Sequence, residues 1–277
     1  MLRRRRDKEK HPRFKGLTFN KIVPNAITVA ATCFGLSGIR FAIEGRWEFA
    51  AAAILIAAIL DTLDGRMARL LNASSNFGAE LDSLSDFVSF GVAPALIIYY
   101  WSLQFLPGFG WAVALFFAVC MGLRLARFNS MLDKLPSYAY NYFQGVPAPA
   151  SAGLCLLPLV ISFVFGPQST LPVIGCAIWV VIVALMTVSS MPTFSFKKMK
   201  IPSKMIIPTL AIVALAIALL ISRPWITMSI VLVAYLLTIP FAISSYGKLK
   251  REAERIKGNE DPKDSDDDSV PKKIGPA

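Results

Sequence analysis

The stretch DTLDGRMARLLNASSNFGAELDSLSD, from Asp61 to Asp86, places four aspartates at the junction of two long apolar runs, 47–63 and 84–101. An apolar helix of about twenty residues spans the hydrocarbon core of a bilayer. Helices suit such runs because lipid offers no partner for backbone polar groups. Carboxylates at membrane depth are costly, and their default interpretation is functional. The stretch therefore predicts membrane helices with a functional acidic site between them.

The same apolar pattern continues over most of the 277 residues, of which 55% are hydrophobic, with a mean hydropathy of +0.55. It predicts an all-α integral membrane protein, with one polytopic domain over residues 22–245. Residues 1–21 are expected to form a basic cytoplasmic leader, and residues 246–277 a charged, disordered cytoplasmic tail. About eight transmembrane helices are expected, over 22–43, 47–63, 84–101, 110–127, 148–166, 170–189, 205–222 and 226–245.

The formal charge of +11 could indicate a nucleic-acid partner, but the basic residues lie at the ends of the apolar runs. With the N-terminus inside, the inner loops receive most of them, for example Arg66, Arg124 and Arg127, whereas the outer loops receive little beyond Arg46 and Arg223. This asymmetry follows the positive-inside rule. We expect a multi-pass protein of the inner (cytoplasmic) membrane, with both termini cytoplasmic, contacts to membrane lipids and no nucleic acid.

The spacing of the acids predicts two helical faces that can meet. Residues at i, i+3, i+4 and i+7 share one face of a helix, and the short loop 70–77 would make the two helices antiparallel neighbours. Four carboxylates would then form an oxygen-only cage, which suits two divalent cations, Mg²⁺ or Mn²⁺. The first face holds Asp61, Asp64, Gly65 and Ala68, and the second holds Gly78, Asp82 and Asp86.

These residues also resemble a known family. The pattern Asp61-x₂-Asp64-Gly65-x₂-Ala68-Arg69-x₈-Gly78-x₃-Asp82-x₃-Asp86 is similar to the full signature of the CDP-alcohol phosphatidyltransferases. The resemblance extends over the first six apolar runs. It implies a six-helix core, here with two extra C-terminal transmembrane helices, which binds a CDP-lipid on two metal ions in a cavity open to the cytoplasm. The family resemblance also suggests a homodimer.

The resemblance implies a role for each matching residue. Asp61, Asp64 and Asp82 would be metal ligands, and Asp86 would share a metal and act as the general base. Arg69 would pair with the diphosphate. Small side chains would let the cytidine and diphosphate approach the backbone, and two residues at the start of the first run would face the nucleotide. The small residues are Gly65, Ala68 and Gly78, and the other two are Asn25 and Thr28.

Three further stretches, 81–99, 122–129 and 142–153, resemble the membrane-bound bacterial phosphatidylserine synthases, and VSSMPTFSFKK (188–198) adds to this. They imply CDP-diacylglycerol and L-serine as substrates. Arg124 and Arg127 could bind the serine carboxylate through an arginine fork, or could simply extend to the interface. Asn129 is a candidate for the serine amino group.

Other acceptors and one other class of protein stay open. Glycerol 3-phosphate would need several cations, and inositol is a further candidate. Choline would need an aromatic cage, for which Tyr138, Tyr140, Tyr142 and Phe143 are available. An ion-coupled transporter would also hold acids in the membrane. Transporters, however, tend to have repeated halves, whereas these four acids cluster in one helical pair.

Overall fold

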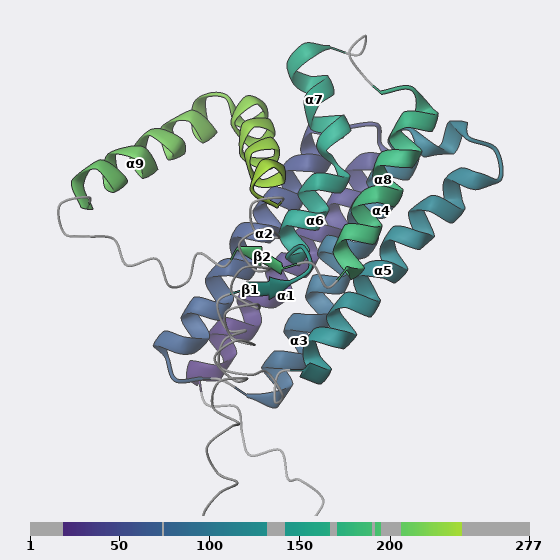
Figure 1. Cartoon of the computed structure of the whole chain (residues 1–277). Helices are drawn as coiled ribbons and strands as arrows, with labels where there is room; N and C mark the ends of the chain where they lie inside the picture. Colours follow the sequence, from purple (N-terminus) through teal and green to yellow (C-terminus); the bar gives the residue numbers. More distant parts are fainter. Residues whose placement is uncertain are drawn as a thin grey trace, which may run out of the picture.

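In the computed structural model of the chain, the residues that are described are 19–73, 75–131, 142–166, 171–189, 192–194 and 206–239. All eight predicted apolar runs contain a helix there, so the all-α prediction is confirmed, and α1–α8 form one bundle (Figure 1). Most of the predicted leader, the whole predicted tail, and Tyr138 and Tyr140 lie outside the described residues.

The N-terminal half builds the part of the bundle that positions the acids. Helix α1 (Phe19–Ile43) packs against α2 (Trp47–Leu70) through small residues, and a methyl group on Gly38 would lie 3.3 Å from the Ala50 carbonyl oxygen. Small side chains allow this close approach of membrane helices. A second pass then runs unbroken over 26 residues, as α3 (Asn76–Asp86), the π-helix η1 (Phe87–Val92) and α4 (Ala93–Trp101).

The C-terminal half begins after the short 3₁₀ turn η2 (Leu103–Phe105). It contains α5 (Phe109–Met131), α6 (Ala148–Cys155), α7 (Leu157–Phe165) and α8 (Val173–Val188). Helices α6 and α7 meet at a bend of 49° with Pro158 in the first turn of α7, where its missing N–H cannot continue the hydrogen bonding of the preceding helix. Large apolar side chains fill this half, and Leu154, Leu159 and Val180 are fully buried.

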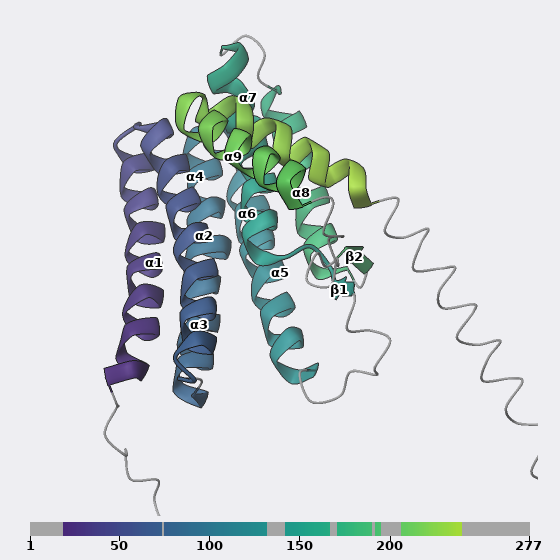
Figure 2. The same ribbon diagram turned by 90° about the vertical axis from the view of Figure 1, so that its left-hand side faces the viewer.

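The last described helices stand apart from the main bundle. Helix α9 (Ile206–Ser222) projects away from it, and Ile207 is 80% exposed (Figures 1 and 2). The helix Pro224–Ile239 returns to the bundle, where Leu232 and Ile239 are buried in the core. The sequence pattern did not predict one small element, the antiparallel pair β1 (Tyr142–Gln144) and β2 (Pro192–Phe194).

Several of these helices are suited to a membrane by length and composition. The spans Ile22–Ile43, Asn76–Trp101 and Phe109–Ser130 are long and apolar enough to cross one, and the bent pair α6–α7 makes a fourth if it counts as one span. Helix α8, α9 and Pro224–Ile239 are shorter apolar helices within the described part of the chain. The structure therefore supports a polytopic membrane protein, and the total of eight spans stays a prediction.

Candidate active site

A line of hydrogen bonds joins α1 to α3 and η1, and we call its four residues, Thr28, Thr32, Ser85 and Ser89, the polar seam. The Thr32 hydroxyl donates to Ser85 Oγ at 2.8 Å, and Ser85 donates to the Thr28 carbonyl oxygen at 3.2 Å. Ser89 donates to the Ala31 carbonyl oxygen at 3.3 Å. Side-chain hydrogen bonds between helices hold membrane bundles in register. The seam therefore fixes how α3 is rotated against α1.

That rotation brings the acids of α2 and α3 together. Carboxylate oxygens of Asp61, Asp64 and Asp82 all lie within 4.8 Å of one another. Asp86 lies one turn beyond Asp82, and its carboxyl shares a hydrogen bond with that of Asp61. Its other oxygen, Oδ1, is buried and has no hydrogen-bond partner within the described structure. The two predicted faces do meet, and all four carboxylates form one cluster.

Very little protein charge balances this cluster. The ion pairs found among the described residues both involve Glu44, at the other end of α1, and neither includes an aspartate. Asp64 is only 4% exposed, and it accepts a hydrogen bond of 2.6 Å from the Thr28 hydroxyl. Carboxylates this close cannot all be ionised at once unless cations lie between them; without cations, some of them must be protonated. The cluster could therefore hold a cation, and the donor to Asp64 in it is the neutral hydroxyl of Thr28.

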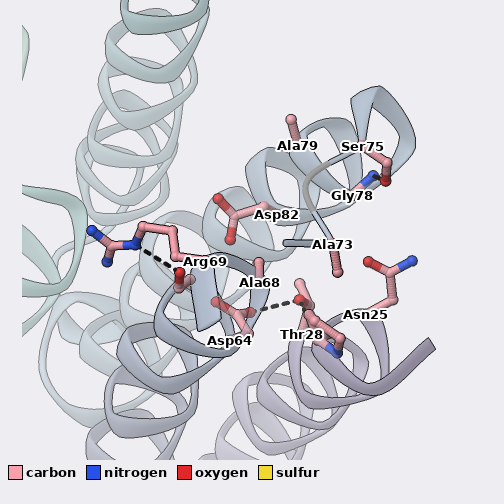
Figure 3. A pocket seen from close by; sticks show the side chains of 12 residues that line it. Asn25, Thr28, Asp64, Ala68, Arg69, Ala73, Ser75, Gly78, Ala79 and Asp82 are labelled. Atoms are coloured by element: carbon pink, nitrogen blue, oxygen red, sulfur yellow. Dashed lines mark hydrogen bonds between the residues drawn. The ribbon is translucent and has the colours of Figure 1, made fainter. Parts of the chain in front are cut away.

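A cavity of about 530 Å³ opens beside Asp64 and Asp82, at the end of the bundle where α1 begins (Figure 3). Gly65 and Ala68 line it, and a methyl group added to Gly65 would meet no atom within 4 Å. Arg69 lies at its edge, with Nε donating to the Gly65 carbonyl oxygen at 2.9 Å. The cavity is therefore large enough for a small-molecule group, and Gly65 leaves its wall bare.

The other wall of the cavity comes from α1 and the start of α3. Gly78 is tightly packed, because a methyl group there would lie 3.1 Å from Asn25 Oδ1 and 3.2 Å from Ser75 Oγ. Ser75 caps α3 by accepting a hydrogen bond from the Gly78 backbone N–H at 3.1 Å. Asn25 and Thr28 both line the cavity, and their contact with a nucleotide stays a prediction. Gly78 thus serves helix packing as well as the cavity wall.

The three side chains predicted to bind the acceptor differ in their surroundings. Arg124 on α5 is buried and faces Asp86, and its Nε atom has no hydrogen-bond partner within the described residues. Arg127 donates from Nη2 to the Ser189 carbonyl oxygen at 3.1 Å, at the C-terminal end of α8. Asn129 is exposed and donates to Ser83 Oγ on α3 at 3.0 Å. The structure therefore brings Arg124 to the acids, and engages Arg127 and Asn129 elsewhere.

Some features of the site were not predicted from the sequence. Ser75 was missed, although a serine directly before a helix is a common N-cap signal. The π-helix η1 begins directly after Asp86, and π-helical segments often occur at functional sites. It lies against α5, since a methyl group on Gly91 would lie 3.1 Å from Met121 Cγ. No local pattern in the sequence marks this segment.

The sequence was compared with known protein families after these observations. The model of the family CDP-alcohol phosphatidyltransferase matches residues 21–171, which include the whole cavity and all four acids. The chain belongs to the CDP-alcohol phosphatidyltransferase family. It is accordingly a phosphotransferase enzyme of the membrane. A second model, CDP-alcohol phosphatidyltransferase 2, matches residues 204–240, which include the apolar run 205–222 and most of the last run, 226–245.

Curated relatives are similar to this phosphatidyltransferase over most of its length. A protein of Mycobacterium bovis is 40% identical over 236 residues, which is 84% of this chain and 82% of that protein. One of Helicobacter pylori is 34% identical over 220 residues, 78% of this chain and 88% of that protein. One of Bacillus subtilis is 39% identical over 145 residues, 52% of this chain and 77% of that protein. All three are named CDP-diacylglycerol–serine O-phosphatidyltransferase.

Proposed function

We propose that this enzyme transfers the phosphatidyl group of CDP-diacylglycerol to the hydroxyl of L-serine and releases CMP. The observation that carries the proposal is the cluster of four carboxylates between a cavity on one side and a buried arginine, Arg124, on the other. The names of the relatives support serine as the acceptor.

Two divalent cations fit the carboxylate cluster. Asp61, Asp64 and Asp82 each offer a carboxylate oxygen within 4.8 Å of the others, and Asp86 lies one turn beyond Asp82 on the same helix. Oxygen ligands of this kind suit Mg²⁺ or Mn²⁺. Asp61, Asp64 and Asp82 would be ligands, and Asp86 would share one cation. When bound, the cations would stabilise the charge on the attacking and leaving oxygens.

The cavity is suited to the cytidine diphosphate group. Asp64 and Asp82 line it, so a diphosphate there would lie directly beside the cation ligands. The bare backbone at Gly65 and the small side chain of Ala68 leave room for a bulky group. Arg69 at the edge could pair with a phosphate oxygen. Asn25 and Thr28 lie on the opposite wall, where they could contact the nucleotide.

The chemistry requires one proton transfer and one displacement at phosphorus. The serine oxygen forms a bond to the phosphatidyl phosphorus, and the bond from that phosphorus to the CMP oxygen breaks. Asp86 takes the proton of the serine hydroxyl as general base, since it is the innermost acid and has a free oxygen. No covalent enzyme intermediate is required.

Arg124 is our candidate for binding the serine carboxylate, because it is buried beside Asp86 and forms no ion pair within 4 Å in the described structure. A buried charge without a close partner is costly, and a bound carboxylate would offset that cost. Arg127 and Asn129 remain weaker candidates for the same site. Choline, inositol and glycerol 3-phosphate remain alternative acceptors for the same chemistry.

We further propose that the site faces the cytoplasm of the cell inner membrane and that the enzyme is a homodimer. Asn25 and Thr28, near the start of α1, line the cavity (Figure 3). Arg66 and Arg69 lie at the same end, so the positive-inside rule supports this orientation for the site and for both termini. The dimer rests on the family resemblance alone.

The proposal is tested by an acceptor assay on the purified enzyme in detergent. Each reaction receives CDP-diacylglycerol, Mg²⁺ or Mn²⁺, and one of serine, choline, inositol or glycerol 3-phosphate, and CMP release is followed. We expect CMP with serine alone, and none after EDTA treatment until a divalent cation is restored.

Two variants complete this assay. Asp86→Asn should lower CMP release with serine by about 100-fold or more, the usual loss for a general base. Glu80→Gln, an exposed acid on the same helix, should leave it unchanged. Release with choline in place of serine would keep the mechanism and overturn the acceptor. Folded protein that is silent with every acceptor but moves solute into liposomes would instead be a transporter.

A further inference from the structure

The cavity has a polar end that lies away from the acid cluster. Figure 3 shows Ser75, Gly78 and Asn25 together at this end. Asp82 lies farther along the cavity and follows Ser75 by seven residues, which is roughly 10 Å along the axis of α3. A ligand that spans the cavity would therefore reach the cation ligands with one end and Ser75 with the other.

The hydroxyl of Ser75 has a hydrogen that the protein does not use. Its oxygen accepts a hydrogen bond from the Gly78 backbone N–H at 3.1 Å, and the hydroxyl donates to no group among the described residues. A serine hydroxyl can donate one hydrogen bond while it accepts others. Because Ser75 lines the cavity and is only half-buried, a ligand there can accept that hydrogen.

Asn25 on α1 places an acceptor beside this donor. Its Oδ1 atom lies 3.1 Å, and Ser75 Oγ 3.2 Å, from the point where a methyl group on Gly78 would lie. Because Gly78 leaves that point empty, the two oxygens lie close together on one wall of the cavity. This wall thus offers a hydrogen-bond donor and a hydrogen-bond acceptor side by side.

We propose that Ser75 is a specificity-determining residue that binds the base of the nucleotide substrate. With the diphosphate beside Asp64 and Asp82, the ribose would direct the base toward Ser75. One edge of cytosine carries the ring nitrogen N3, which accepts a hydrogen bond, next to an amino group, which donates one. Ser75 would donate to N3, and Asn25 Oδ1 would accept from the amino group.

Uracil has the opposite pattern at these two positions, a donor at N3 and an acceptor beside it. A uracil base would therefore leave the polar groups of Ser75 and Asn25 unmatched, and sites built to hydrogen-bond a substrate reject analogues in this way. The inference rests on the proposed function and adds to it the choice of base.

The test compares three substitutions of Ser75 in the full-length enzyme, because Ser75 also caps α3. Ser75→Ala removes the cap and the hydroxyl, whereas Ser75→Gly removes the hydroxyl but keeps most of the capping effect. We expect KM for CDP-diacylglycerol to rise about five- to tenfold in both, the usual loss for one hydrogen bond, with KM for serine unchanged. Ser75→Thr keeps the cap and the hydroxyl, and it should recover most of the affinity.

The thermal midpoint in detergent separates the contact from the cap. The alanine variant should lose about 2–4 °C and the glycine variant less. If KM for CDP-diacylglycerol rose only in the alanine variant, Ser75 would be a helix cap and the proposal would be overturned. A rise of both KM values in the glycine variant would overturn it as well.

Inhibition by CMP and by UMP tests the contact with the base itself. Wild-type enzyme should bind CMP more tightly than UMP, and Ser75→Gly should reduce that preference about five- to tenfold by weakening CMP alone. Equal weakening of both nucleotides would place the contact at the ribose or the phosphate, against the proposal. Wild-type enzyme that releases no CMP with any acceptor would instead refute the proposed function, and this outcome is seen without any variant.

Discussion

The two halves of the bundle are held together in different ways. Between α1 and α3 the contacts are hydrogen bonds of the polar seam, such as Thr32 to Ser85 at 2.8 Å. Around α6–α8 they are mostly apolar, with Leu159 and Val180 fully buried. In lipid, apolar packing brings helices together without fixing polar groups, whereas a hydrogen bond fixes one side chain against another. The difference indicates that α1–α3 position the four acids, whereas α6–α8 supply the scaffold.

The largest effect that would test this comparison is expected in the polar half. Asp64→Asn removes a proposed cation ligand at a position that is 4% exposed. We expect the rate of CMP release to fall by more than about 100-fold, because loss of a supporting partner alone typically costs about 10–100-fold. The thermal midpoint should stay within a few degrees of wild type. A variant that unfolds in detergent would show instead that Asp64 is part of the scaffold.

The opposite result is expected in the apolar half. Leu159→Ala, in α7, should lower the free energy of unfolding by about 2–4 kcal/mol, since it leaves a cavity at a fully buried site. The Mg²⁺ or Mn²⁺ concentration for half-maximal activity should not change. Leu210→Ala on α9, where the side chain is 63% exposed, is the control and should cost little stability. A marked loss of cation affinity in Leu159→Ala would mean that the two halves are not separate in function.

Thr28 tests the seam itself with a smaller change. Thr28→Val keeps the shape of the side chain but removes the hydroxyl that donates to Asp64 Oδ2 at 2.6 Å. The cation concentration for half-maximal activity should rise by about 10–100-fold, as for other residues that orient a metal ligand. Thr62→Val is the matched control, because its hydroxyl bonds only to the Ala58 carbonyl oxygen of its own helix. Equal behaviour of the two variants would contradict the role given to Thr28.

The sequence predicted what depends on local spacing. The helices over the apolar runs and the meeting of Asp61, Asp64 and Asp82 follow from patterns of three or four residues and a short loop, whereas Thr28 was singled out by the family resemblance alone. The π-helix after Asp86 did not follow. It packs against α1 and α5, and such packing between distant segments is not specified by a single sequence.

Gly65 offers the smallest and most discriminating change. An alanine there meets no protein atom within 4 Å, and alanine in place of a helical glycine usually adds about 0.5–1 kcal/mol to the free energy of unfolding. The same methyl group projects into the space that we assign to the cytidine diphosphate. Gly65→Ala should therefore raise the thermal midpoint slightly and also raise KM for CDP-diacylglycerol, with KM for serine unchanged.

Gly45→Ala is a useful contrast. Gly45 also has open space but a positive φ of 72°, so its variant should lose stability and keep both KM values. If Gly65→Ala gained stability without any change in KM, the nucleotide would have to bind elsewhere, and the division between a positioning half and a scaffold half would lose its main support.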